Sequence, residues 1–301
     1  MNAYRKYALF TLAATVAVIV WGAYVRASGS GAGCGAHWPL CNGVLIPETE
    51  AQKTWVEFSH RLSSGVLISC VGGLLVWAWR LFPRSSFAFR AAAVSFLAVW
   101  VEAFVGAFLV LLGLVEKDKS VLRVWSVSLH LANTLFLLAA LTCAALAPRM
   151  ATPRWRWPAR QSPWWPRCLV LGFVLLGAFG AVAALGDTLF PPSSVIGGIA
   201  ADWNGQGHVA ERIRVLHPLL AVSWAGAFAY WMAGLWERLP MLRRIGQKCI
   251  AVAALNLCLG LLNIALLAPL WLQMLHLAIA NLLWIVFVAA LFSAASNPEF
   301  R

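Results

Sequence analysis

The sequence predicts an all-α integral membrane protein with eight transmembrane helices, arranged as two homologous four-helix bundles. Three observations support this fold class. The 301 residues are 61% hydrophobic and only 11% charged, and the mean hydropathy is +0.78, which excludes an ordinary soluble domain. The apolar segments are continuous runs of about 20 residues, as spanning helices require, rather than the alternating segments of about 10 residues typical of membrane barrels. The chain also repeats itself internally.

The eight expected helices follow from the apolar runs, taken in chain order. They are 7–27, 57–81, 89–114, 124–146, 166–186, 215–237, 247–268 and 270–294. The first run follows Arg5 and Lys6, as in a secretory signal peptide, but it exceeds the roughly 7–15 apolar residues of such a peptide. We therefore expect it to remain as a spanning helix.

The distribution of charge predicts the orientation. If the N-terminus is inside, most Lys and Arg residues fall on the inner side, where basic residues collect in membrane proteins, and most acidic residues fall outside. The net charge of +12 is then explained by topology and by anionic lipid, so we expect no nucleic-acid partner. The prediction is a multi-pass protein of the cell membrane with both termini cytoplasmic.

Matching motifs divide the chain into two halves. SLHLANTLFLLAAL from Ser128 resembles MLHLAIANLLWIVF from Met274, and EFSHRLSSG from Glu57 pairs with RVLHPLLAV from Arg214. Glu102 and Gly106 have the same spacing as Asn256 and Gly260. The predicted units are therefore 1–147, a basic cytoplasmic linker 148–165, and 166–301.

Four of the six histidines lie in the apolar segments, toward their outer ends. They are His60, His130, His217 and His276. A single such residue is often a satisfied packing histidine, but four at matched positions indicate function, because ionisable groups in a membrane are costly. Two per half suit axial ligation of a haem iron. The residue four positions after each histidine is small, which leaves room for a porphyrin and equally favours helix packing; zinc is a weaker fit.

The first half carries extra polar groups near its histidines. Glu57 lies three residues before His60 on the same helix face, and Arg61 follows directly. Glu57 could act as an acid or base, could bind a polar substrate group, or could form a salt bridge with Arg61 or Arg26. Arg26, Arg61 and Arg214 are expected to pair with haem propionates at the outer surface.

The segment CGAHWPLC places Cys34 and Cys41 in the long outer loop 28–56. On this oxidising side a disulfide is favoured over a zinc site, which would need four ligands. The bridge could be structural or redox-active. The five other cysteines lie in apolar segments and are expected to be structural. His208, in the second long outer loop, is expected to be solvated.

These residues resemble the heme A synthase family, in its cysteine-pair-containing bacterial type. The similarity spans essentially the whole chain and is most specific in VRASGSGAGCGAHWPLCNG from Val25 and in the Glu-x-x-His-Arg motif at 57–61. The resemblance implies oxidation of the C8 methyl group of haem O to a formyl group, giving haem A for cytochrome oxidase. It implies that His60 and His130 receive the substrate haem O, that His217 and His276 hold a resident haem b, and that Glu57 lies at the reaction centre.

The resemblance also implies an association with a haem O synthase and an unidentified electron donor or acceptor. One position departs from the family, because Pro218 follows His217 where many members have arginine. Arg212 or Arg214 is expected to take over the role of that arginine. The main alternative is a diheme b-type protein that only transfers electrons, and a haem exporter is a weaker one. The differences between the two halves favour an enzyme, since a simple electron conduit has no need of Glu57 or a cysteine-closed loop in one half alone.

Overall fold

The computed structural model describes residues 1–149, 164–203 and 207–296. These residues form nine α-helices and two short 3-10 turns, and they include no β-strand. The α-helices are α1 (Asn2–Ala27), α2 (Gln52–Leu81), α3 (Phe87–Leu111), α4 (Val121–Leu146), α5 (Trp165–Leu189), α6 (Val195–Trp203), α7 (Val209–Arg238), α8 (Arg243–Ala265) and α9 (Leu270–Ser296).

The predicted all-α membrane fold is confirmed. Eight of the helices are long and apolar enough to cross a membrane, and each matches one predicted segment. The short α6 was not predicted. Helix α7 starts at Val209, earlier than expected from hydropathy, because its first turns carry Glu211, Arg212 and Arg214. Pro218 therefore lies inside this helix rather than near its start.

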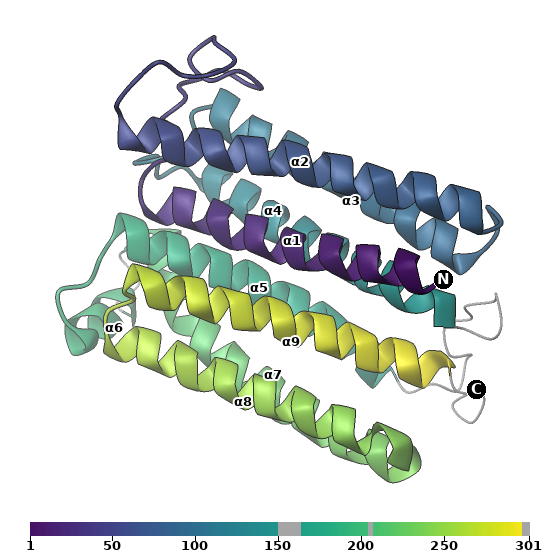
Figure 1. Ribbon diagram of the computed structural model, residues 1–301. Coiled ribbons are helices and arrows are strands. Elements are labelled where there is room, and N and C mark those ends of the chain that lie inside the picture. The colour runs from purple at the N-terminus through teal and green to yellow at the C-terminus, as the bar shows by residue number, and fades with distance from the viewer. Residues whose placement is uncertain (150–163, 204–206, 297–301) are drawn as a thin grey trace.

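The spanning helices lie side by side, with the start of α1 and the end of α9 at the same end of the bundle (Figure 1). The loop between α1 and α2 and the segment with α6 lie at the opposite end. Neighbouring helices pack in chain order within α1–α4 and within α5, α7, α8 and α9. This arrangement is consistent with two four-helix units. Most of the predicted linker, 150–163, lies outside the described residues.

The two sets of helices meet through α1 and α4 on one side and α5 and α9 on the other. The buried core is continuous across this boundary. The indole Nε1 of Trp284 in α9 donates to the backbone oxygen of Leu135 in α4 at 2.7 Å, and the Trp284 ring stacks on Phe173 of α5 with 4.9 Å between centroids. Small residues such as Ala144 and Ala290 are fully buried, which lets the helices approach closely.

Helices α3 and α8 end in the same way. In both, the chain turns through a left-handed residue, Gly113 (φ 66°) after α3 and Leu267 (φ 58°) after α8. The N–H of the next residue then donates back into the last helical turn, from Leu114 to Leu109 and from Ala268 to Asn263. Glycine adopts this conformation without strain, whereas leucine does so at a cost.

Candidate functional site

The four predicted histidines all lie near the end of the bundle that has the α1–α2 loop and α6, called the loop end below. His60, His130, His217 and His276 fall within about the first three turns of α2, α4, α7 and α9. In each of them the ring nitrogen Nδ1 is buried and has no hydrogen-bond partner. A buried polar atom without a partner is uncommon, so the four matched rings share an unusual environment.

The second-half pair has a geometry that suits one iron between two imidazoles. The centroids of His217 and His276 are 6.5 Å apart and the rings are nearly perpendicular, at 86°. Axial imidazoles on one iron have ring centres about 6 Å apart, given metal–nitrogen bonds of roughly 2 Å and about 1 Å from each nitrogen to its ring centre. The residues present therefore fit a bis-histidine haem.

Glycines on neighbouring helices make room for the histidine rings, a feature that the sequence did not reveal. A Cβ atom on Gly180 of α5 would lie 2.8 Å from Cε1 of His217, and one on Gly22 of α1 would lie 2.7 Å from Cε1 of His60. Both glycines occupy the first helix of their half. A weaker contact of this kind, 3.2 Å, joins Gly260 of α8 to His276.

A carboxylate lies beside the first-half pair and was noted in the sequence only as part of the repeat. Glu102 of α3 has its Oε1 atom 3.3 Å from Nδ1 of His130, although the two atoms form no hydrogen bond. The same carboxylate accepts hydrogen bonds from Thr134 and from Nδ2 of Asn133, the latter at 2.6 Å. Such a cross-helix contact depends on how α3 and α4 are rotated, which the local sequence does not specify.

The loop between α1 and α2 is closed by a disulfide between Cys34 and Cys41, with S–S 2.04 Å. Both cysteines are almost fully buried, at 0% and 1% exposure. The loop is fixed to the start of α2 by Thr54, whose hydroxyl donates to the backbone oxygen of Gly33 at 2.8 Å. The bridge is therefore shielded and lies against the helix that carries His60.

Glu57 and Arg61 form the main connection between this loop and α2. Glu57 Oε2 accepts from the backbone N–H of Cys34 at 2.8 Å, and its Oε1 accepts from Nε and Nη2 of Arg61 at 3.1 and 2.5 Å. Arg61 Nη1 also donates to the backbone oxygens of His37 and Leu40, at 2.5 and 2.6 Å. Of the two ion-pair partners considered for Glu57, the structure has Arg61.

Comparisons with known proteins agree with these features. Residues 5–288 match the family described as cytochrome oxidase assembly protein (COX15-CtaA). The chain belongs to this family.

Among curated relatives, a protein of Thermus thermophilus named protoheme IX farnesyltransferase is 40% identical over 98% of this chain and 49% of its own length. A heme A synthase of Alkalihalophilus pseudofirmus is 39% identical over 34% of this chain and 33% of its own length. A heme A synthase of Lysinibacillus sphaericus is 39% identical over 37% of each chain. The chain thus spans about half the length of the Thermus relative, and the haem-related names of all three relatives agree with its family.

In this family member, the side chain of Arg26 bonds to the other half of the protein. Its Nη1 atom donates to the backbone oxygen of Ala184 and to the hydroxyl of Thr188, both at 3.0 Å and both in α5. Arg26 thus joins the last turn of α1 to the second half at the loop end of the bundle.

Arg214 is held by two carboxylates of the second half that lie outside its own helix. Its Nε and Nη2 atoms pair with both oxygens of Asp202 in α6, at 2.7 and 2.6 Å, and its Nη1 atom reaches Asp187 at 3.2 Å and the backbone oxygen of Phe190 at 2.9 Å. The second half therefore also has carboxylates near its histidine motif, although they lie outside the stretch 214–218 that matches 57–61. These acids were missed because they come from α5 and α6, far from Arg214 in sequence.

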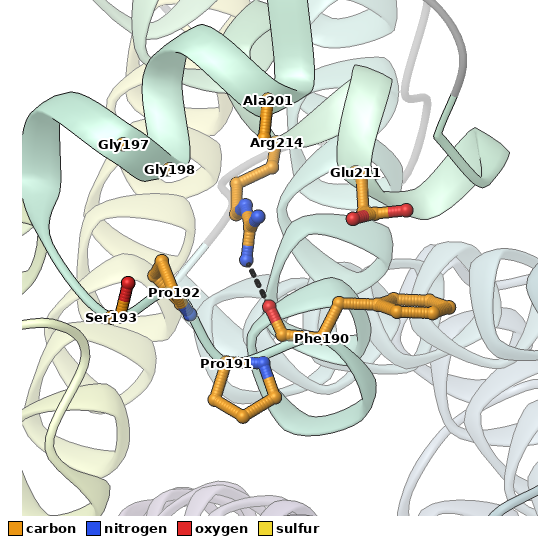
Figure 2. Close-up of a pocket in the computed structure, with 9 residues that line it drawn as sticks. All are labelled: Phe190, Pro191, Pro192, Ser193, Gly197, Gly198, Ala201, Glu211 and Arg214. Carbon is orange, nitrogen blue, oxygen red and sulfur yellow. Dashed lines mark hydrogen bonds between the residues drawn. The ribbon is translucent and has the colours of Figure 1, made fainter.

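A pocket of about 250 Å³ lies beside this cluster, between α6 and α7. Figure 2 shows Arg214 pointing toward Phe190, with Pro192 and Ser193 on the opposite side from Glu211. The pocket belongs to the second-half loop region.

His208 has partners, contrary to the expectation that it is solvated. It caps α7, its Nδ1 accepting from the N–H of Ala210 at 3.2 Å while Glu211 accepts from its backbone N–H at 2.7 Å. Its Nε2 lies 2.7 Å from the backbone oxygen of Lys119, and its ring stacks on Phe190. His208 therefore connects the start of α7 to the α3–α4 loop.

Proposed function

We propose that the protein is a heme A synthase, which oxidises the C8 methyl group of haem O to a formyl group. The observation that carries this proposal is the pair of half-buried histidines at matched positions in each half of a cytochrome oxidase assembly family member. The conversion removes four electrons from the methyl carbon and adds one oxygen atom, through two hydroxylations and loss of water. The step balances when water supplies the oxygen, four protons are released and the four electrons pass to an unidentified acceptor.

The two pairs take different haems in this proposal. His60 and His130 hold the substrate haem O, and His217 and His276 hold a resident haem b, which when bound supplies one-electron redox chemistry. The 6.5 Å separation of the His217 and His276 rings supports the second assignment. The carboxylate of Glu102 beside His130, where the second half has Asn256 at the matching position, supports placing the reaction in the first half.

Glu57 is proposed to act at the mouth of the first-half site. Both of its oxygens already accept hydrogen bonds, from Cys34 and Arg61, so its contacts support a role in holding the loop over the site. Proton transfer by Glu57 would require one of these bonds to be exchanged. The buried disulfide supports a structural role for Cys34 and Cys41 in the same loop.

Arg26, Arg61 and Arg214 are proposed to meet haem propionates, since all three lie at the loop end of the bundle. Each already has acceptors in the protein. A propionate would therefore join or replace these acceptors, with Arg214 the basic group nearest the second-half motif.

The substrate is proposed to come from a haem O synthase associated with this chain. The Thermus relative is named protoheme IX farnesyltransferase and is about twice as long as the segment that this chain matches. Its name describes farnesyl transfer to protohaem, and a farnesylated haem is the substrate that our proposal requires.

The deciding experiment is expression in a host that lacks haem A, together with a haem O synthase, followed by extraction and chromatography of the haems. We expect a formyl-bearing haem with the wild-type protein and its loss in His60→Ala and Glu57→Ala, with haem b retained. Bound haem b without any haem A in the wild type would instead favour the diheme electron carrier.

We also propose that both termini are cytoplasmic. The two ends of the described chain lie at the same end of the bundle (Figure 1). The α2–α3 and α7–α8 connections lie at that end too, and basic residues such as Arg80, Arg84 and Arg243 lie in or next to them. Labelling of single cysteines placed near Glu48 by an impermeant reagent on intact cells would confirm this orientation, and protection of that position would refute it.

A further inference from the structure

Glu102 is a carboxylate inside a membrane-spanning helix that the haem assignments leave unexplained. It lies in α3, and its side chain is 19% exposed. Carboxylates at such positions are rare and tend to be functional. Its carboxylate is directed at α4 by two donors there, the hydroxyl of Thr134 and Nδ2 of Asn133.

These donors bring Glu102 close to Nδ1 of His130, the nitrogen that would stay free of iron if this ring binds iron through Nε2. Oε1 of Glu102, which accepts from Thr134, lies 3.3 Å from Nδ1 of His130. Nδ2 of Asn133 also donates to the backbone oxygen of Ala98 in α3 at 3.0 Å, which locks α3 and α4 together at this level.

The second half lacks this arrangement at the matching positions. Asn256 of α8 stands where the first half has Glu102, and Ala280 stands where it has Thr134. The side-chain oxygen of Asn256 has no hydrogen-bond partner. One histidine site therefore has an anionic partner held in place by two donors, and the other has a neutral amide.

We propose that Glu102 is a positioning residue that accepts the Nδ1–H of His130, so that Nε2 of this histidine is presented to the iron of the first-half haem. This inference rests on the proposed function, because it assigns His130 as an iron ligand. Carboxylate–histidine–metal arrangements orient the ring and make the imidazole a stronger donor. The stronger donor and the added negative charge stabilise the ferric state, so the first-half haem has a lower midpoint potential than it would have beside a neutral group.

The test measures properties of bound haem rather than turnover. Each variant also carries His276→Ala, which removes a ligand of the second-half haem. The measured signals then come from haem b bound at the first-half pair during expression. The readouts are the midpoint potential by optical titration and the low-spin ferric signal by electron paramagnetic resonance. Glu102→Gln keeps the shape of the side chain but removes its charge, and Glu102→Asp keeps the charge.

We expect Glu102→Gln to raise the midpoint potential and to change the ferric signal, and Glu102→Asp to restore both in part. Glu116→Gln, which removes a carboxylate that instead pairs with Lys53 at 3.7 Å, is the matched control and should leave both unchanged. Glu102→Gln protein that binds haem with the wild-type potential and signal would overturn the inference. If Glu102→Gln does not accumulate, Thr134→Val decides in the same way, with a smaller shift expected because it removes only one donor to Glu102.

Failure of the proposed function gives a different result. A wild-type protein that binds two haems but makes no haem A would refute the synthase assignment, while the Glu102→Gln shift could still be measured. The reciprocal change Asn256→Asp, read in a His60→Ala background, should lower the midpoint potential of the second-half haem.

Discussion

Replacing Arg61 with alanine should release the disulfide loop of residues 28–51 from the start of α2. Arg61 bonds to Glu57 through Nε and Nη2 and to the backbone oxygens of His37 and Leu40 through Nη1. The side chains of Arg61 and Glu57 are only 11% and 4% exposed, so water does little to screen the pair. The substitution would leave the Glu57 carboxylate buried without its cation.

The expected size of the effect follows from this burial. Removing one partner of a buried ion pair costs about 3–5 kcal/mol. At about 1.4 kcal/mol per tenfold change, local opening of the loop should become roughly a hundredfold to a few thousandfold more frequent. The disulfide and the Thr54 contact remain, so the loop should loosen rather than unfold the bundle.

Amide hydrogen exchange of the protein in lipid nanodiscs measures this opening directly. We expect faster exchange at Cys34 and Asn42, whose N–H groups bond to Glu57 and to the backbone oxygen of Cys34, with no change in the middle of α4. Lys53→Ala is the matched control, because its pair with Glu116 is well exposed, at 61% and 39%, and such pairs contribute little. Exchange in Arg61→Ala within threefold of the wild-type rate would refute the reasoning.

Three further changes probe other parts of the structure. Gly180→Ala should displace the His217 ring, since the new Cβ would lie 2.8 Å from Cε1, and should reduce the absorbance of the second-half haem several-fold. Gly226→Ala is the control, because its Cβ would have nothing within 4 Å. Equal haem absorbance in the two variants would contradict the role of this contact. Leu267→Gly should raise the free energy of unfolding by about 1 kcal/mol, because it relieves the backbone strain of a left-handed leucine at φ 58°. A lower melting temperature would contradict this. Asp202→Asn should speed hydrogen exchange in α6 by roughly tenfold or more, since a charged hydrogen bond contributes about 1.5–3 kcal/mol; unchanged exchange there would show that this ion pair does not hold α6.

The sequence by itself determined the parts of this protein that depend on local composition. Eight apolar runs predicted eight spanning helices, because burial in lipid requires about 20 apolar residues in a row and a helix satisfies its own backbone. The repeated LHLA strings and the histidines at matched depths were equally visible, since spacing along a helix fixes depth. The pairing of Cys34 with Cys41 in the structure also joins residues close in sequence.

Only the tertiary structure decided which side chains from different helices meet. Glu102 lies beside His130, Arg26 bonds to α5, and Asp202 pairs with Arg214, and none of these contacts leaves a pattern in hydropathy. The first turns of α7 were missed because they are charged, and their ends are held by the His208 cap and the Arg214 ion pairs. Helix α6 was missed because its nine residues are too few for a spanning helix. Hydropathy records how each residue interacts with lipid or water, whereas helix rotation and register, set by packing over the whole bundle, determine the partners of polar groups.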